Sequence, residues 1–393
     1  ARPCGRTSAE GSETALPPTL TTPEMKIALL TLPLHANYGG VLQAFALKNY
    51  LERSGHDVWL IDNHRQDPPV GNLFLRTVLR RAVESLFHHK EIFAEMNDAR
   101  TRDYKKSEIE KFIYHHLAPR TFPVYDREDF AALRNEGFDL FIVGSDQVWR
   151  PRYARNTDIY FFSFLEGTPL RRISYAASFG AAACEYSPEE KKRCARLLAG
   201  FSGVSVREKT GVEQCRDYFG YDGARQVLDP TLLLTAEDYR PFIHTETSSG
   251  NSLFCYLFRI KSRMRRTLRR LASQRGMQII RRTDRTSESS GKMPGIEQWL
   301  TELYNARYVI TDSFHACVFC ILFHKPFAAW INQRRGSARI RSLLELFGLE
   351  NRIVESETDL GELLNTPIHW NTVDRKLEAC RADSRDFLAA YTE

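Results

Sequence analysis

The chain has 393 residues, of which 42% are apolar and 11% aromatic, and its formal net charge is +6 at pH 7. This length exceeds that of a typical single domain and predicts two globular domains with their own cores. The mild positive charge suits an anionic small molecule or a membrane surface. Because a nucleic-acid partner requires a strongly basic domain and a recognisable binding module, we expect no nucleic acid.

Residues 1–24 are rich in Pro, Thr, Ser and Gly and contain no apolar core of a signal peptide. We expect them to be a disordered leader or a segment foreign to the fold, which begins at Met25. No run of about 18 apolar residues follows, so we predict no transmembrane helix.

The first half of the chain alternates apolar runs with helical patterns, as in a doubly wound α/β domain. We predict a domain over residues 25–240, on the acceptor side, with strands at 26–31, 57–62, 138–143, 172–177, 203–206 and 226–228 and helices at 41–54, 127–135 and 187–200. Residues 74–116 form a helical insertion with basic and apolar residues at helical spacing. Two interpretations of it stay open: a basic amphipathic helix that touches anionic lipid, or a helix packed on its own domain.

A polar stretch near residues 245–251 separates this series from a second one. We predict a second Rossmann-like domain over 241–372, on the donor side, with strands at 252–258, 277–280, 307–311 and 326–331. An arginine-rich helix around residues 263–270 has the same two interpretations as the insertion. The last stretch, 373–393, has a helical pattern and is expected to cross back to the first domain. Two facing Rossmann-like domains predict a cleft between them.

The segment from Asn37 to Ala44 is the most informative motif of the chain. It follows an apolar strand, contains Gly39 and Gly40, and opens an apolar helix. A helix start behind a glycine turn offers free N–H groups to an anion. Because no third glycine and no Lys-Ser/Thr pair follows, a dinucleotide site or a P-loop is not indicated.

Polar side chains recur where the predicted strands end, which is where open α/β sheets bind ligands. These clusters are residues 31–44, 144–149, 174–180, 204–209 and 311–316. Five clusters in one register predict a polar cleft lined by both domains.

His315 is the sharpest catalytic candidate, because a histidine at a strand-to-helix turn can act as general acid or base near neutral pH. Its alternative role is packing at the helix start. Ser313 and Asp312 are candidate N-cap residues, and for Asp312 we favour that role. Asp146 is either a turn residue or a group that binds a sugar hydroxyl.

Arg207 ends a strand that should be buried, and a buried guanidinium needs an anion. Its partner is either Glu208 or a bound carboxylate or phosphate. Arg339 begins a helix, and it is either placed there to hold an anion or is a solvated surface arginine, which is the interpretation favoured for this residue taken alone. The aromatic residues Tyr38, Tyr175 and Trp149 have two open roles, stacking on a sugar or packing in a core.

The eight cysteines are scattered, which indicates buried reduced thiols in a cytosolic protein. Cys317 and Cys320 have the spacing of a redox or zinc pair. However, no second pair completes a metal site and both lie in an apolar helical pattern. We therefore predict no metal and a cytoplasmic protein, with the inner face of the membrane as an open alternative.

Taken together, these motifs resemble the polysaccharide pyruvyl transferase family. The similarity runs in order from about residue 26 to about residue 350 and lies in the segments 37–44, 144–149, 174–180, 205–208, 228–231, 312–315 and 337–340. The resemblance implies a glycosyltransferase-B-like pair of Rossmann-like domains. It also implies ketal pyruvyl transfer from phosphoenolpyruvate, as co-substrate and without a cofactor, to a sugar of a surface polysaccharide or its lipid-linked precursor.

The resemblance further implies roles for an arginine at Arg207, a histidine at His315 and a later basic residue near Arg339. We predict these roles: catalytic His315 and Asp146; donor-binding Arg207, Arg339 and Ser313; acceptor-binding or loop-ordering Asn37, Gly39, Gly40, Gln43 and Ser178. One departure stands at Phe314, because better-known members carry an arginine shortly before the histidine. A glycosyltransferase with a nucleotide-sugar donor and a non-catalytic glycan-binding relative are the competing predictions.

Overall fold

The protein is described by a computed structural model. It describes residues 25–34, 37–64, 108–154, 156–245, 250–258, 260, 262–283, 294–331, 337–356 and 360–393. The leader 1–24 and most of the insertion, up to residue 107, lie outside the described residues.

The first sheet has seven parallel strands in the order β3-β2-β1-β4-β5-β6-β7. The strands are β1 Lys26–Leu30, β2 Asp57–Asn63, β3 Arg120–Val124, β4 Leu140–Val143, β5 Arg171–Ala177, β6 Gly203–Val206 and β7 Arg225–Gln226. The order reverses between β1 and β4, which makes their carboxyl ends the topological switch point where such sheets bind ligands.

The second sheet has five parallel strands in the order β12-β11-β10-β8-β9. They are β8 Ser252–Tyr256, β9 Gln278–Arg282, β10 Tyr308–Thr311, β11 Phe327–Trp330 and β12 Ile353–Val354. The switch point of this sheet lies between β8 and β10. Both predicted sheets are therefore present, and the fold class is confirmed.

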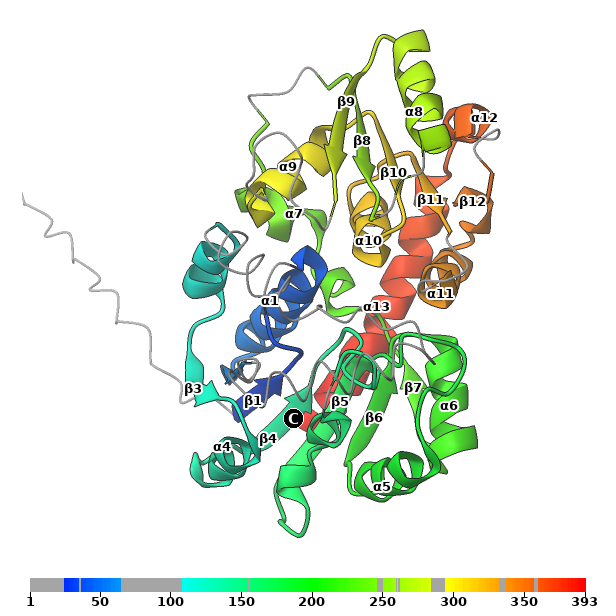
Figure 1. Ribbon diagram of the computed structural model, residues 1–393. Helices are drawn as coiled ribbons and strands as arrows, with labels where there is room; N and C mark the ends of the chain where they lie inside the picture. Colours follow the sequence, from blue (N-terminus) through cyan, green and yellow to red (C-terminus); the bar gives the residue numbers. More distant parts are fainter. Residues whose placement is uncertain are drawn as a thin grey trace, which may run out of the picture.

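Helices flank both sheets (Figure 1). They are α1 Tyr38–Arg53, α4 Arg127–Ala132, α5 Pro188–Leu198, α6 Lys209–Phe219, α7 Ala236–Tyr239, α8 Ser262–Gln274, α9 Ile296–Asn305, α10 Phe314–Leu322, α11 Ser337–Phe347, α12 Leu360–Asn365 and α13 Trp370–Thr392; short 3₁₀ turns are Leu133–Asn135, Thr157–Phe161, Ser163–Leu165, Pro230–Leu232, Arg240–Phe242 and Glu350–Arg352.

Strands β3 and β12 were not predicted from sequence. Strand β3 carries Arg120 and Pro123, is exposed at the consecutive residues Phe122 and Pro123, and lies at the edge of its sheet. Such a strand lacks the continuous apolar run of a buried parallel strand. Strand β12 has only two residues and also lies at an edge.

One continuous apolar core joins the two sheets. It contains Val41 and Phe45 of α1 together with Trp299 of α9 and Phe319 of α10. Helix α13 adds a second connection and runs from the second sheet to the first in Figure 1. There the Arg381 guanidinium donates to the carbonyls of Leu232 and Leu234 at 2.6 and 2.8 Å.

The described end of the insertion is helical over residues 108–116. Ile109, Phe112 and Ile113 are buried in the core that contains Phe45. This part of the insertion therefore packs on its own domain, and the residues before it lie outside the described ones.

Candidate active site

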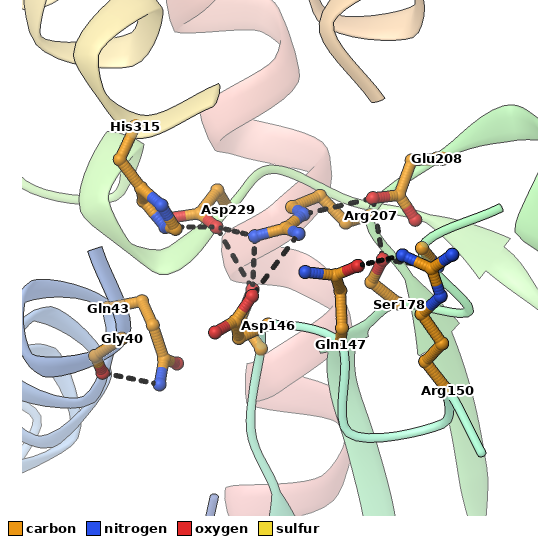
Figure 2. A network of polar contacts seen from close by, with 12 residues as sticks. Gly40, Gln43, Asp146, Gln147, Arg150, Ser178, Arg207, Glu208, Asp229 and His315 are labelled. Carbon is orange, nitrogen blue, oxygen red and sulfur yellow. Dashed lines mark hydrogen bonds and ion pairs between the residues drawn. The ribbon is translucent and has the colours of Figure 1, made fainter. Parts of the chain in front are cut away.

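Arg207 is the centre of a buried polar cluster at the end of β6 (Figure 2). Its Nη1 donates to Asp229 Oδ2 at 2.6 Å, and its Nε donates to Glu208 Oε1 at 3.2 Å. Asp146 Oδ1 lies 3.9 Å from Nη2. The ring of Phe314 stacks on the guanidinium, 4.1 Å from its centroid to the central carbon. Three carboxylates and one aromatic face thus hold a single arginine.

The carboxylates determine the charge state of Arg207. Burial alone would lower its pKa, but Glu208, Asp229 and Asp146 raise that pKa above its ordinary value. The predicted alternative for Arg207, a structural partner in Glu208, is therefore present, although two further carboxylates share this guanidinium.

Asp229 links the arginine to the candidate histidine. Its Oδ2 lies 3.5 Å from His315 Nε2 and accepts from Ser145 Oγ at 3.0 Å, while its Oδ1 accepts from the Thr231 hydroxyl at 2.6 Å. Burial alone would raise the pKa of Asp229, but the charges of His315 and Arg207 and the Thr231 hydroxyl hold it well below its usual range. The Asp229 carboxylate is therefore ionised and lies next to Nε2 of His315.

Asp229 belongs to the segment 228–231, one of the segments that resemble the family, but the sequence alone assigns no role to this residue. The sequence feature that could have pointed to Asp229 is the pair Asp229-Pro230, a polar residue and a proline shortly after β7. The function of this carboxylate depends on its contacts with Arg207 and His315, which come from different parts of the chain. No local sequence pattern predicts these contacts.

Helix α10 presents His315 in its first turn. Ser313 is the N-cap, and its hydroxyl accepts the Ala316 N–H at 3.4 Å. Asp312 does not cap the helix, contrary to the prediction, because its carboxylate accepts the Phe258 N–H at 2.9 Å and so joins the loops after β8 and β10. His315 is buried with 7% of its surface exposed.

The start of α1 closes the site from the first domain. The helix begins at Tyr38, so Gly39 and Gly40 lie inside its first turn and do not form the predicted turn before it. A Cβ on Gly39 would lie 1.9 Å from His315 Nδ1. The missing side chain therefore allows the α1 backbone to pack directly against the imidazole.

Asp146 follows β4 and has a left-handed backbone with φ of 71°. Asp tolerates this conformation better than most residues, and such strain is found where a side chain must be aimed. The carbonyl of Asp146 accepts N–H groups of Val148 and Ser178, and its carboxylate accepts from Asn37 Nδ2 at 3.3 Å. Asp146 and Asn37 thus bring together the two loops at the switch point.

Gln43 and Ser178 are fully buried, and their side chains form hydrogen bonds within the loops of the site. Gln43 Nε2 donates to Thr31 Oγ1 and to the carbonyl of Gly40, both at 2.9 Å. Ser178 Oγ donates to Glu208 Oε1 at 2.8 Å. Of their two predicted roles, the geometry supports loop ordering.

Arg339 approaches the cluster from α11 of the second domain. Burial and the charge of Arg207 lower the pKa of Arg339, while Asp146 and Glu208 partly offset this effect. Within the described part of the chain Arg339 makes no hydrogen bond or ion pair, and its Nε is buried without a partner. Arg341 points elsewhere and pairs with Glu355.

Three buried nitrogens in this cluster have no hydrogen-bond partner: Arg207 Nη2, Arg339 Nε and His315 Nε2. Unsatisfied buried donors are rare and costly in native proteins. An oxyanion between the two guanidinium groups would satisfy them and reduce the repulsion between the arginines. The site can therefore bind an anion next to a histidine that has a carboxylate behind it.

The aromatic candidates are core residues. Tyr175 and Trp149 are fully buried, and Tyr38 stacks on Trp299 at 5.3 Å while its hydroxyl donates to the Pro294 carbonyl at 2.7 Å. Cys317 and Cys320 are also fully buried in α10, and burial raises the pKa of both thiols. They pack as small apolar side chains.

A sequence profile described as polysaccharide pyruvyl transferase matches residues 37–333, which include every site residue above except Arg339. The chain belongs to the polysaccharide pyruvyl transferase family. It is therefore a transferase, and the predicted family is confirmed. No individually curated protein matches the chain significantly.

Solved structures share the fold of this chain at low sequence identity. The UDP-N-acetylglucosamine 2-epimerase from Rickettsia bellii is 10% identical with a TM-score of 0.52, and the superposition covers 94% of this chain and 97% of that one. The UDP-GlcNAc 2-epimerase from Methanocaldococcus jannaschii is 12% identical with a TM-score of 0.54, and the superposition covers 93% of this chain and 100% of that one. These similarities confirm a GT-B-like arrangement of two Rossmann-like domains and carry no statement on substrate.

None of the helices in the described part of the chain combines the length and apolar character needed to cross a bilayer.

Proposed function

We propose that the protein transfers a pyruvyl group from phosphoenolpyruvate to two hydroxyls of one sugar, in a surface polysaccharide or its lipid-linked precursor, and so forms a cyclic ketal. The observation that carries this proposal is the pair of unsatisfied guanidinium nitrogens, Arg207 Nη2 and Arg339 Nε, in the cluster that contains His315. Phosphoenolpyruvate has a phosphate and a carboxylate, which suit two guanidinium groups beside an acid catalyst.

Arg339 is the main cation for the donor in this proposal. The charge of Arg207 is already shared among Asp146, Glu208 and Asp229, and one of its nitrogens remains for a ligand. Arg339 forms no ion pair within the described residues, and Asp146 and Glu208 offset its charge only in part, so a bound oxyanion meets an unpaired guanidinium there. The three carboxylates fix Arg207 in one orientation, which preorganises the site at no cost during the reaction.

His315 is the proposed general acid and base. It donates a proton to the methylene carbon of phosphoenolpyruvate, and the adjacent carbon becomes cationic. Asp229, 3.5 Å from Nε2, stabilises the protonated ring before the transfer. A buried carboxylate also orients the imidazole of catalytic triads, where it bonds Nδ1, whereas Asp229 faces Nε2 of His315.

The sugar then supplies both ketal oxygens. One hydroxyl attacks the cationic carbon, the C–O bond to phosphate breaks, and the second hydroxyl closes the ring. The two hydroxyl protons balance the reaction, since one restores His315 and the other leaves on phosphate. Asp146 and Asn37 lie at the mouth of the switch point and are the proposed contacts to the acceptor.

Phosphoenolpyruvate is a cytoplasmic metabolite, so the proposal places the reaction in the cytoplasm, where a lipid-linked acceptor would be met at the inner face of the membrane.

The test compares His315→Gln with Ser313→Ala in release of phosphate from phosphoenolpyruvate, with a panel of hexopyranosides as acceptors. We expect His315→Gln to lose at least about a hundredfold in kcat while it keeps donor binding, and Ser313→Ala to lose little, because it removes a helix cap. Full turnover in a folded His315→Gln protein would remove His315 from the mechanism. Turnover of a nucleotide sugar instead would identify a glycosyltransferase, and sugar binding without use of any donor would identify a glycan-binding relative.

A further inference from the structure

The positive charge of the protein is concentrated in one segment. Residues 252–283 contain ten Lys and Arg residues and no Asp or Glu, whereas the net charge of the whole chain is only +6. The rest of the chain is therefore net acidic. A charge asymmetry of this kind indicates an anionic partner at one place on the molecule.

Half of these basic residues lie on α8. Met264 and Leu268 bury one face of the helix against the core of the second domain. The opposite face exposes Arg266, Arg269 and Arg270. Within the part of the chain that the structure describes, these three arginines form no ion pair. In Figure 1, α8 lies at the end of the second domain that is farthest from the first sheet.

This arrangement is unfavourable for the helix itself. Arg266 is spaced three residues from Arg269 and four from Arg270, and like charges at these spacings destabilise a helix. Arg263 and Arg265 also stand in the first turn, where the helix dipole favours acidic residues. No acidic side chain on α8 offsets these repulsions.

Helix α5 provides the contrast within the same protein. Its basic residues follow Glu189 and Glu190 in the first turn. Arg193 pairs with Asp158 at 2.7 Å, and Arg196 pairs with Glu166 at 2.9 Å. An ordinary solvated helix of this protein therefore balances its charges, and α8 does not.

We propose that the arginine face of α8 docks the protein on the anionic headgroups of a membrane. The helix is about 20 Å long, so its exposed arginines can meet several lipid phosphates in one plane. Because its apolar face is already used in the core, the contact is peripheral, electrostatic and sensitive to salt. A lipid-linked acceptor would lie on the same surface, a consequence that rests on the proposed function.

The test is co-sedimentation of the full chain with vesicles of phosphatidylglycerol and phosphatidylcholine, and with phosphatidylcholine alone. The variant combines Arg266→Gln, Arg269→Gln and Arg270→Gln. The matched control combines Lys192→Gln, Arg193→Gln and Arg196→Gln on α5, which removes the same charge from another exposed face. We expect binding to the anionic vesicles only, weakened about a hundredfold in the α8 variant and little in the control.

Equal losses in both variants would overturn the proposal, because net charge alone would then explain binding. Wild-type protein that ignores anionic vesicles would overturn it as well. A single-stranded oligonucleotide that binds more tightly than the vesicles would assign α8 to nucleic acid instead. None of these outcomes bears on pyruvyl transfer, since the assay contains neither donor nor acceptor.

Discussion

Replacing Gly39 by alanine tests whether α1 positions His315. The added Cβ would lie 1.9 Å from Nδ1, 2.4 Å from Cγ and 2.6 Å from Cε1 of the imidazole. A normal contact between such atoms is about 3.5 Å, so the ring or the helix must move by about 1.5 Å. Misplacement of a catalytic group by about 1 Å can cost about a hundredfold in rate. We therefore expect kcat to fall by about a hundredfold or more.

The matched control is Gly40→Ala in the same turn. Its Cβ would meet the end of the exposed Asn37 side chain at 3.0 Å, which can rotate away. Alanine is the better helix former at both positions, so the intrinsic helix term favours both variants by up to about 1 kcal/mol. Any loss specific to Gly39→Ala therefore comes from the contact with His315.

The assay is phosphate release from phosphoenolpyruvate as a function of pH, together with the thermal midpoint with and without donor. Gly39→Ala should bind the donor, show a lower kcat and shift the pH profile of kcat, because its imidazole leaves Asp229. Gly40→Ala should keep the donor binding and pH profile of the wild type, and a change should be confined to the acceptor KM, because only the Asn37 side chain moves. A folded Gly39→Ala protein with unchanged kcat and pH profile would refute the idea that the first domain seats the histidine.

Three further predictions concern the charges of the site. Asp229→Asn should lower the free energy of unfolding by about 3–5 kcal/mol, measured in urea, because Arg207 loses its shortest ion pair in a buried cluster; a change below about 1 kcal/mol would contradict this role. Arg339→Gln should abolish donor binding in calorimetry and leave urea stability unchanged or higher, since a cation next to Arg207 is removed; retained affinity would place the donor elsewhere. The lowered pKa of Asp229 contributes stability above the ordinary aspartate pKa of about 3.9, and this contribution is lost as pH falls through the folded pKa. The difference in unfolding free energy between wild type and Asp229→Asn should therefore stay constant from pH 7 to about pH 5, and a difference that disappears near pH 6 would contradict the assigned charge.

The buried parallel strands were predictable from sequence, because each is a short continuous apolar run between turn residues. The runs at 140–143 and 308–311 are examples. The edge strand β3 was not, since pairing with β2 and not burial stabilises Arg120 and Pro123 in an extended form. The start of α1 was also misplaced, because two glycines are poor helix formers, and the close approach of His315 explains only Gly39 inside the helix.

The site was partly predictable for a related physical reason. The carboxyl ends of parallel strands converge, so polar residues after β4, β6 and β10 were expected to meet, and Asp146, Arg207 and His315 belong to one cluster. The role of Asp229 and the contact between Arg207 and Phe314 depend on packing between distant segments. The family's usual arginine is absent at Phe314, and its ring instead supports the guanidinium of Arg207.

The central claim is that Arg339 and Arg207 hold phosphoenolpyruvate beside His315. The most direct measurement is the thermal midpoint of the wild type and of Arg339→Gln with phosphoenolpyruvate, with a uridine diphosphate sugar as comparison. A ligand that binds only the folded state raises the midpoint by mass action, by about 2.7 kcal/mol of stability at a hundred times its Kd. The account predicts a rise with phosphoenolpyruvate that disappears in Arg339→Gln, and no rise with the nucleotide sugar. A rise with the nucleotide sugar alone would contradict it.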